Sequence, residues 1–369
     1  MSLKVLMLVP NLRVSNGVAS YAMNYFRVLD CKKIQMDFAL YYDVQSPYYN
    51  EIKNAGSKCY ILPSVRKPLA HIKACDKILK EGKYDIVHDN TLLISVPMMK
   101  NAERNKVLVR LLHSHSAGLG ETMQKARRNK LFLPLLKRYV TDNAACSDAA
   151  AKVMFGDESY NLIPNIVSDE NLIYSETKRA EVRRKMNVDD KIVIGTVGRM
   201  SPPKNPLFAL DVIKEIINKG QPIEYWWIGS GTMDEEFMKR VSDFGLEKQV
   251  RFLGSREDVV DLYQAMDIFF MPSRFEGLGI AAVEAQAMGL PCIVSDAIPI
   301  EADYTELIKR MPLNAPIDNW ACGIIKCIET LEERQSRSDD LHNSMFSQNK
   351  AADRLTKQYF RMLEKNEKQ

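Results

Sequence analysis

The feature that most constrains the fold is an alternation of short apolar runs with amphipathic runs of helical length, which restarts once along the chain. In the first half, runs of strand length lie at 3–9, 36–41, 58–62, 85–88, 107–112 and 143–146, with helical runs at 17–29, 46–55, 70–81 and 131–141. A second series starts with the strand-like run 192–197 and the helical run 205–218, and its further strand-like runs lie at 223–228, 250–253, 267–271 and 291–294. Strands that alternate with helices predict parallel sheets with helices on both faces. The sequence therefore predicts an α/β protein with two Rossmann-like, doubly wound domains in tandem.

The chain is long enough for two domains, since 369 residues can enclose two cores of ordinary size. The segment 164–191 is polar, charged and without strand periodicity, so we expect the linker there. The predicted domains are 1–165 and 166–348. Ligands of doubly wound domains bind at the carboxyl ends of the strands, so we expect a central cleft that both sheets face.

Charge is distributed unevenly between the two halves. Residues 1–165 contain 24 Lys and Arg against 14 Asp and Glu, whereas residues 166–369 contain 27 against 33. We expect the basic first half to be drawn to an anionic surface. The seven scattered cysteines include no C-x-x-C pair, which favours reduced thiols in a cytoplasmic protein over disulfides or a zinc site. No apolar stretch approaches membrane-spanning length, and the run 3–9 is too short for a signal peptide.

The segment 267–295 combines a strand-like run, a glycine loop, a helical run and a second strand-like run. The loop begins at Glu276, and a second glutamate, Glu284, follows two turns into the helix on a similar face. Backbone N–H groups of residues 277–280 are predicted to form the helix N-terminus, which suits a phosphate. Taken singly, Glu276 could cap the helix and Glu284 could be solvated. The combined pattern predicts a site for a polyhydroxylated, anionic ligand.

This combination resembles the signature of two glutamates, seven residues apart, in the retaining nucleotide-sugar glycosyltransferases of family four, which have the two-domain GT-B fold. The resemblance covers nearly the whole chain and is strongest from about 192 to 296. It implies transfer of a sugar from a nucleoside diphosphate donor, expected to be UDP-linked, to a saccharide acceptor. It also implies that the C-terminal helical run, about 349–369, packs back on the first domain. The segment Ser295–Glu301 lacks the two glycines of many members, a variant that resembles the exopolysaccharide and capsule subgroup.

A Pro-rich loop after the run 192–197 carries Arg199 and Lys204. Arginine offers paired N–H donors and lysine a mobile charge, so the two could hold one diphosphate, although a solvated basic loop is the plain alternative. The resemblance implies that this pair clamps the leaving diphosphate in place of a divalent metal. Because the sequence has no Asp-x-Asp motif or His/Cys cluster with metal spacing, we expect no metal and no cofactor beyond the donor substrate.

Two glycine-containing loops are predicted to bind the nucleotide. Gly229 and Gly231 follow the run 223–228, and by itself this G-x-G is weak evidence. The resemblance implies that both glycines line the nucleotide pocket and that Leu253 and Arg256, on the next loop, contact the base.

The resemblance also assigns separate roles to the two glutamates. Glu284 is implied to accept hydrogen bonds from the ribose hydroxyls, and Glu276 to lie nearest the transferred sugar. Gly277, Leu278 and Gly279 are implied to offer backbone N–H groups to the sugar or phosphate.

Candidate residues in the first half lie in loops after strand-like runs. His113 and His115 follow the run 107–112, at a predicted cleft edge. The resemblance implies that His113 contacts the donor sugar near its reacting carbon and that His115 lies on the acceptor side. It also places Asn16 on the acceptor side, and Gly17 and Asn165 beside the donor. Asn165 could instead only brace the hinge.

The segment Lys125–Arg138 places basic residues around an apolar centre. It could be a helix that buries its apolar face and solvates its charges. Alternatively, it could attach the protein peripherally to anionic lipid at the inner face of the cell membrane. The excess of positive charge in the first half favours the second reading.

The sequence thus predicts a glycosyltransferase that acts on a saccharide or lipid-linked saccharide in exopolysaccharide, capsule or cell-surface glycan synthesis, with no nucleic-acid partner. A sugar-nucleotide epimerase of the same fold and a non-catalytic nucleotide-sugar-binding protein are the alternatives. A nicotinamide oxidoreductase is disfavoured because neither first strand leads into a complete glycine fingerprint.

Overall fold

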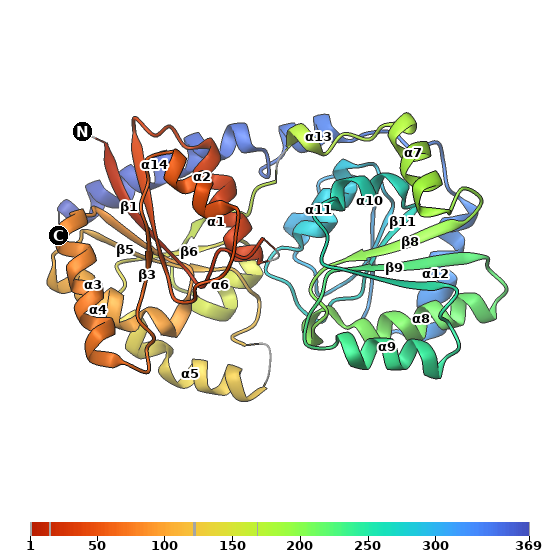
Figure 1. The fold of residues 1–369 in the computed structure, drawn as a ribbon, viewed down its shortest axis with the longest axis horizontal. Coiled ribbons are helices and arrows are strands. Elements are labelled where there is room, and N and C mark those ends of the chain that lie inside the picture. The colour runs from red at the N-terminus through yellow and green to blue at the C-terminus, as the bar shows by residue number, and fades with distance from the viewer. Residues whose placement is uncertain (1, 15, 121–122, 168, 369) are drawn as a thin grey trace. The chain divides into compact units, whose positions relative to one another are not determined.

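The computed structural model describes residues 2–14, 16–120, 123–167 and 169–368, and the chain divides into two compact units. Unit 1 comprises Met1–Ile166 and Met345–Gln369, and unit 2 comprises Val167–Ser344. Each unit contains one parallel sheet with helices on both faces (Figure 1). The prediction of two doubly wound parallel sheets is confirmed.

Unit 1 is built on a seven-stranded sheet in the order β3-β2-β1-β4-β5-β6-β7. Its strands are β1 (Leu3–Val9), β2 (Ile34–Leu40), β3 (Cys59–Ile61), β4 (Ile86–Asp89), β5 (Val109–Ser114), β6 (Asp142–Ala145) and β7 (Asn161–Leu162). The central strand β1 is an almost continuous apolar run because a parallel strand is buried on both faces. The strand order reverses between β1 and β4, which makes the loops after these strands the expected ligand site.

The helices of unit 1 include the last one in the chain. They are α1 (Gly17–Val28), α2 (Tyr48–Asn54), α3 (Pro68–Gly82), η1 (Leu92–Ser95), α4 (Val96–Arg104), α5 (Met123–Lys137), α6 (Asp148–Phe155) and α14 (Gln348–Glu367). Helix α14 packs on α1 and β5, and it contributes Leu355, Tyr359 and Met362 to the core of unit 1. The end of the chain is thereby part of the first unit.

Unit 2 has a six-stranded sheet in the order β10-β9-β8-β11-β12-β13. Its strands are β8 (Ile192–Val197), β9 (Ile223–Ile228), β10 (Val250–Gly254), β11 (Ile268–Met271), β12 (Cys292–Ser295) and β13 (Ile308–Met311). The order reverses between β8 and β11, so the loops after these two strands flank the switch point. Both candidate loops, the one with Arg199 and Lys204 and the one with Glu276, lie there.

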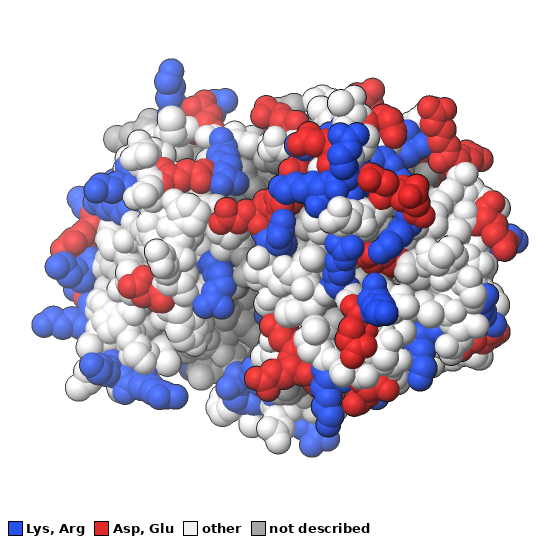
Figure 2. All heavy atoms as spheres, turned by 45° about the vertical axis from the view of Figure 1, so that its right-hand side comes forward, with Lys and Arg blue, Asp and Glu red and all other residues white. Residues whose placement is uncertain are grey.

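The helices of unit 2 form two layers (Figure 1). They are η2 (Asp169–Asn171), α7 (Glu176–Met186), η3 (Pro202–Lys204), α8 (Pro206–Asn218), α9 (Asp234–Asp243), α10 (Val259–Ala265), α11 (Ile280–Ala287), η4 (Ile300–Ala302), α12 (Ile317–Glu329) and α13 (Ser338–Asn343). Helix α12 packs on α8 at one face, where Trp227, Phe270 and Trp320 fill the core. The visible face of unit 2 mixes both signs of charge, as Figure 2 shows, without a broad field of one sign.

Two segments differ from the sequence prediction. Helix α5 begins at Met123 and ends at Lys137, whereas the helical run was expected at 131–141. The predicted linker, 164–191, contains α7, which packs on α10 of unit 2. Helix α7 consists mainly of charged residues, and the first half of α5 is rich in basic ones. Such segments have helix propensity but no apolar periodicity that marks a helix in the sequence.

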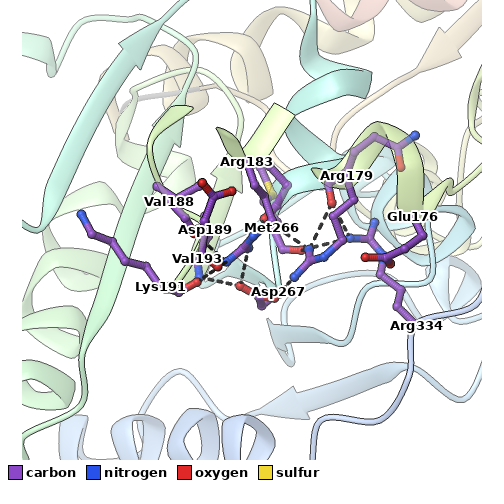
Figure 3. Close-up of polar contacts among 12 residues, drawn as sticks. Glu176, Arg179, Arg183, Val188, Asp189, Lys191, Val193, Met266, Asp267 and Arg334 are labelled. Atoms are coloured by element: carbon purple, nitrogen blue, oxygen red, sulfur yellow. Dashed lines mark hydrogen bonds and ion pairs between the residues drawn. The ribbon is translucent and has the colours of Figure 1, made fainter. Parts of the chain in front are cut away.

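Arginines hold α7 against the sheet of unit 2 (Figure 3). Arg183 donates to the carbonyls of Ala265 and Val188 and to Oδ2 of Asp267, which lies 3.1 Å away. Arg179 donates to the carbonyl of Met266 at 2.7 Å and also pairs with Asp267. The Asp267 side chain is 9% exposed and also accepts the backbone N–H of Val193. These bonds attach α7, which lies within the predicted linker, to the amino ends of β8 and β11.

Among the described residues, no helix has both the length and the apolar character needed to cross a bilayer. All seven cysteines are free thiols.

Candidate functional site

Three loops of unit 2 meet backbone to backbone at the carboxyl edge of its sheet. The N–H of Gly198 donates to the carbonyl of Ile228, and the N–H of Gly229 donates to the carbonyl of Gly254. A Cβ atom at Gly229, where φ is +124°, would lie 2.3 Å from the oxygen of Gly198. A Cβ at Gly231 would lie 2.1 Å from the oxygen of Met200. The G-x-G after β9 is therefore required by close packing of the loops, whatever it binds.

Lys204 and Glu276 form an ion pair across the switch point. The lysine Nζ lies 2.6 Å from Oε1 of Glu276, and the two side chains are 20% and 12% exposed. Lys204 also lies against Gly198, where a Cβ would be 3.1 Å from the lysine Cε. Lysine has three N–H donors, so one bond to Glu276 leaves two for another anion. Arg199 lies exposed on the same loop.

The Glu276 loop leads into α11 through Gly279, which has φ of +87° and precedes the first helical residue, Ile280. The predicted N–H cluster at 277–280 thus lies at the start of a helix of eight residues, where the first N–H groups have no intrahelical partner. Leu278 is buried. Arg274, which the sequence reading overlooked, braces this loop: its N–H donates to the carbonyl of Pro203, and its Nε to Oδ1 of Asn205.

Glu284 is half-buried on α11, where its carboxyl group meets Tyr263 of α10. Burial raises its pKa from the usual 4.5 to about 7, although the hydroxyl of Tyr263 and the charge of Lys204 act in the opposite direction. The Tyr263 hydroxyl donates to Oε2 of Glu284 at 3.0 Å. Tyr263 belongs to α10 and gives no local sequence signal, since its contact with Glu284 depends on how two helices pack. Glu284 is therefore only partly solvated.

The two predicted base contacts lie on β10 and the loop after it. Leu253 belongs to β10 and is half-buried. Arg256 forms a two-pronged ion pair with Asp258, at 2.8 and 2.5 Å. Its guanidinium is therefore already engaged by a neighbouring carboxylate on an exposed loop.

The histidine candidates of unit 1 lie at the carboxyl end of β5, next to β4. His113 lies within β5, and its side chain is buried. His115 follows the strand and lies against His113 with ring centroids 4.0 Å apart. The Nε2 atom of His115 lies 2.7 Å from Oδ1 of Asn90, and its Nδ1 atom 3.3 Å from Oδ1 of Asn165. Asn165 and Asn90 therefore both belong to the histidine cluster. Asn90 was not predicted from the sequence.

Asn16 and Gly17 begin α1. The Asn16 side chain caps the helix by accepting the N–H groups of Val18 and Ala19 at 2.9 and 3.3 Å. A Cβ at Gly17 would meet nothing within 4 Å, so the fold does not require glycine there. Asn16 thus has a local structural role.

Residues 2–14, 16–120, 123–167 and 169–368 contain no group of three or more His, Cys, Asp or Glu side chains arranged to hold a metal ion. The polar groups brought together in unit 2 are one lysine, two glutamates and a helix N-terminus. Such a set suits an anion flanked by hydroxyl groups.

Residues 191–316 match the protein family described as glycosyl transferases group 1. The chain is 30% identical over 319 residues to the glycosyltransferase EpsF of Bacillus subtilis (strain 168), covering 83% of each protein. It is 26% identical to the UDP-Gal:alpha-D-GlcNAc-diphosphoundecaprenol alpha-1,3-galactosyltransferase of Escherichia coli, covering 76% of each. Its fold is similar to that of Anabaena Alr3699/HepE in complex with UDP and glucose, with a TM-score of 0.80, 16% identity, and 96% and 99% of the two chains covered.

Proposed function

Because the chain belongs to the group 1 glycosyltransferases, we propose that it transfers a sugar from a UDP-sugar to a saccharide or lipid-linked saccharide, with retention at the anomeric carbon, in the synthesis of a cell-surface polysaccharide. The observation that carries this proposal is the Lys204–Glu276 ion pair at the switch point of unit 2. Lys204 also lowers the pKa of Glu284, so its charge acts on both glutamates. One cation between two carboxylates, beside a helix N-terminus, suits a diphosphate that joins a ribose to a sugar.

In this proposal, each group of unit 2 has one task. Lys204 and Arg199 stabilise the diphosphate as the bond to the sugar breaks, and the N-terminus of α11 adds backbone N–H donors. Glu284 accepts the ribose hydroxyls, and Glu276 holds the transferred sugar. No side chain is assigned as a covalent nucleophile, and the leaving phosphate takes the acceptor proton.

The proposed task of unit 1 is to contact the sugar and the acceptor. His113 contacts the transferred sugar, and His115 with Asn16 lies on the acceptor side. At neutral pH these histidines are uncharged, because burial lowers the pKa of His115 to about 4 and that of His113 well below its usual value. They therefore act as hydrogen-bonding groups and not as cations.

A panel of nucleotide sugars tests the donor. A bound donor raises the unfolding temperature by mass action, so UDP-sugars are expected to raise it more than GDP-, ADP- or CMP-sugars do. The best donor is then incubated with saccharide acceptors, with and without chelator. Transfer that continues in the presence of chelator supports the charge clamp, and a strict requirement for metal contradicts it. Conversion of donor alone would indicate an epimerase, and binding without turnover a binding protein.

We also propose that α5 contacts an anionic membrane, where a lipid-linked acceptor would be presented. The helix buries Asn129, Leu133 and Leu136 but leaves Met123 72%, Leu131 74%, Phe132 48% and Leu135 47% exposed. Lys125, Arg127, Arg128 and Lys130 are also exposed on it. A helix that hides its apolar residues would not leave four of them in water. Each basic residue near an anionic surface contributes about 1 kcal/mol of attraction.

Sedimentation with liposomes tests this contact. We expect binding to vesicles that contain anionic lipid at low salt, and weaker binding at high salt. The double substitution Leu131→Ser and Phe132→Ser is expected to weaken binding about tenfold, because two apolar side chains no longer enter the interface. Phe360→Ser on α14 is the control, since Phe360 is a similarly exposed aromatic residue of unit 1. Equal loss in both variants, or no binding by the wild type, contradicts the contact.

A further inference from the structure

A chain of hydrogen bonds links the last helix of the protein to His113. The hydroxyl of Tyr359 on α14 lies 2.7 Å from Nδ1 of His88, which belongs to β4. The Nε2 atom of His88 lies 3.0 Å from Nδ1 of His113 on the neighbouring strand β5. All three side chains are at most 3% exposed. The three residues come from distant parts of the sequence.

Both histidines in this chain are neutral near pH 7. Burial lowers the pKa of His88 to about 3 and, with the neighbouring histidines, lowers the pKa of His113 well below its usual value. A neutral imidazole has one N–H donor and one lone-pair acceptor. The linked hydrogen bonds can therefore point in either of two directions. That direction decides which ring nitrogen of His113 carries the hydrogen.

The buried tyrosine sets the direction. Among the described residues, His88 is the hydrogen-bonding partner found for the Tyr359 hydroxyl. If Nδ1 of His88 carried the hydrogen, the hydroxyl hydrogen of Tyr359 would be buried without an acceptor, which is costly. Tyr359 therefore donates to Nδ1 of His88, Nε2–H of His88 donates to Nδ1 of His113, and His113 carries its hydrogen on Nε2.

The surroundings of His113 agree with this direction. The backbone carbonyl of Ile163 raises the pKa of His113, a smaller effect than burial, as expected for a carbonyl near an N–H group. This approach lies outside hydrogen-bond geometry, so Nε2 of His113 remains a buried atom without a hydrogen-bonding partner among the described residues. An N–H group on Nε2 suits the nearby carbonyl oxygen of Ile163, whereas a lone pair there would face another lone pair.

We propose that Tyr359 is a positioning residue that acts through His88 to fix His113 as an Nε2–H donor. The inference rests on the proposed function, in which His113 contacts the transferred sugar. With the hydrogen on Nε2, His113 can donate to a sugar oxygen, whereas the opposite tautomer would present a lone pair to it. Helix α14 then has a chemical role in the first unit in addition to filling its core.

Nitrogen-15 NMR of the histidine rings tests the proposal directly. The chain has five histidines, so their ring signals can be assigned by substituting each in turn. In the wild type at pH 7, His88 and His113 are both expected to be Nε2–H tautomers. In Tyr359→Phe, both rings are expected to show a mixture of tautomers, because the hydrogen that set the direction is gone. Tyr84→Phe is the matched control, since the hydroxyl of Tyr84 is likewise buried in unit 1 but bonds to Asp37.

Kinetics provide the second measurement. Tyr359→Phe is expected to lower kcat roughly three- to tenfold, about the contribution of one hydrogen bond, and to leave KM for the donor nearly unchanged. Tyr84→Phe is expected to keep the wild-type kcat. An Nδ1–H tautomer of His113 in the wild type overturns the proposal even if the variant does not fold, and so do unchanged tautomers in Tyr359→Phe. If no donor is turned over by any form, the proposed function fails, while the spectra still decide the tautomers.

Discussion

Glu284 offers a quantitative test of the candidate site, because the raised pKa of its half-buried carboxyl group should make the stability of unit 2 depend on pH. The perturbation is Glu284→Gln, which keeps the shape of the side chain and an oxygen that can accept from the Tyr263 hydroxyl. Glutamine has no proton to lose. Any pH dependence that disappears in the variant therefore belongs to this carboxyl group.

The magnitude follows from the pKa. Burial raises the pKa of Glu284 from 4.5, the value expected in the unfolded chain, to about 7 in the native state. Between these values the native state binds more protons than the unfolded state, so the free energy of unfolding falls as pH rises. The full difference corresponds to roughly 3 kcal/mol above pH 7, of which about 2 kcal/mol is lost between pH 5.5 and pH 8.5. Over that range Glu284→Gln should gain about 2 kcal/mol of stability relative to the wild type.

The assay is urea unfolding followed by tryptophan fluorescence. The three tryptophans, Trp226, Trp227 and Trp320, are all buried in unit 2, so the signal reports the unit that contains Glu284. Glu333→Gln, at an exposed position of the same unit, should follow the wild-type curve. If the difference between Glu284→Gln and the wild type is the same at pH 5.5 and pH 8.5, the pKa of the carboxyl group is not raised as described and the reasoning is refuted.

Four further predictions use the same preparations. Lys204→Ala should lower kcat by about a hundredfold or more, because the positive charge that stabilises the leaving diphosphate is lost. Lys219→Ala, which removes only a surface ion pair with Asp318, should retain activity. Wild-type turnover in Lys204→Ala would rule out the clamp. Asp267→Asn should lower the free energy of unfolding of unit 2 by about 3–5 kcal/mol, because two arginines lose a largely buried partner, and a urea curve that matches the wild type would contradict this. Gly231→Ala should destabilise unit 2 by about 1–3 kcal/mol because its Cβ meets a carbonyl oxygen. Gly17→Ala should keep wild-type stability by circular dichroism, and loss of transfer in it would indicate that substrate approaches this backbone.

The pattern of apolar residues was sufficient to predict the fold class. The run Ile192–Val197 restarts the alternation, and it forms the central strand β8 of a second parallel sheet. Helix α7 was not predicted, because its charged residues favour helix without an apolar stripe. Helix α7 is held by Arg179 and Arg183, whose partners follow α10, about 80 residues later in the chain. No local pattern contains that information.

The sequence by itself determined which chemical groups stand after which strands, including the lysine and the two glutamates at the carboxyl edge of the second sheet. Tertiary structure decided how they are paired and protonated. Lys204 and Glu276 are 72 residues apart and form an ion pair because the strand order brings the loops after β8 and β11 together. Packing against α10 partly removes Glu284 from water, which raises its pKa to about 7. His113 takes its tautomer from Tyr359, a residue of the last helix. Pairing and protonation depend on distance and burial, and both are properties of the folded chain.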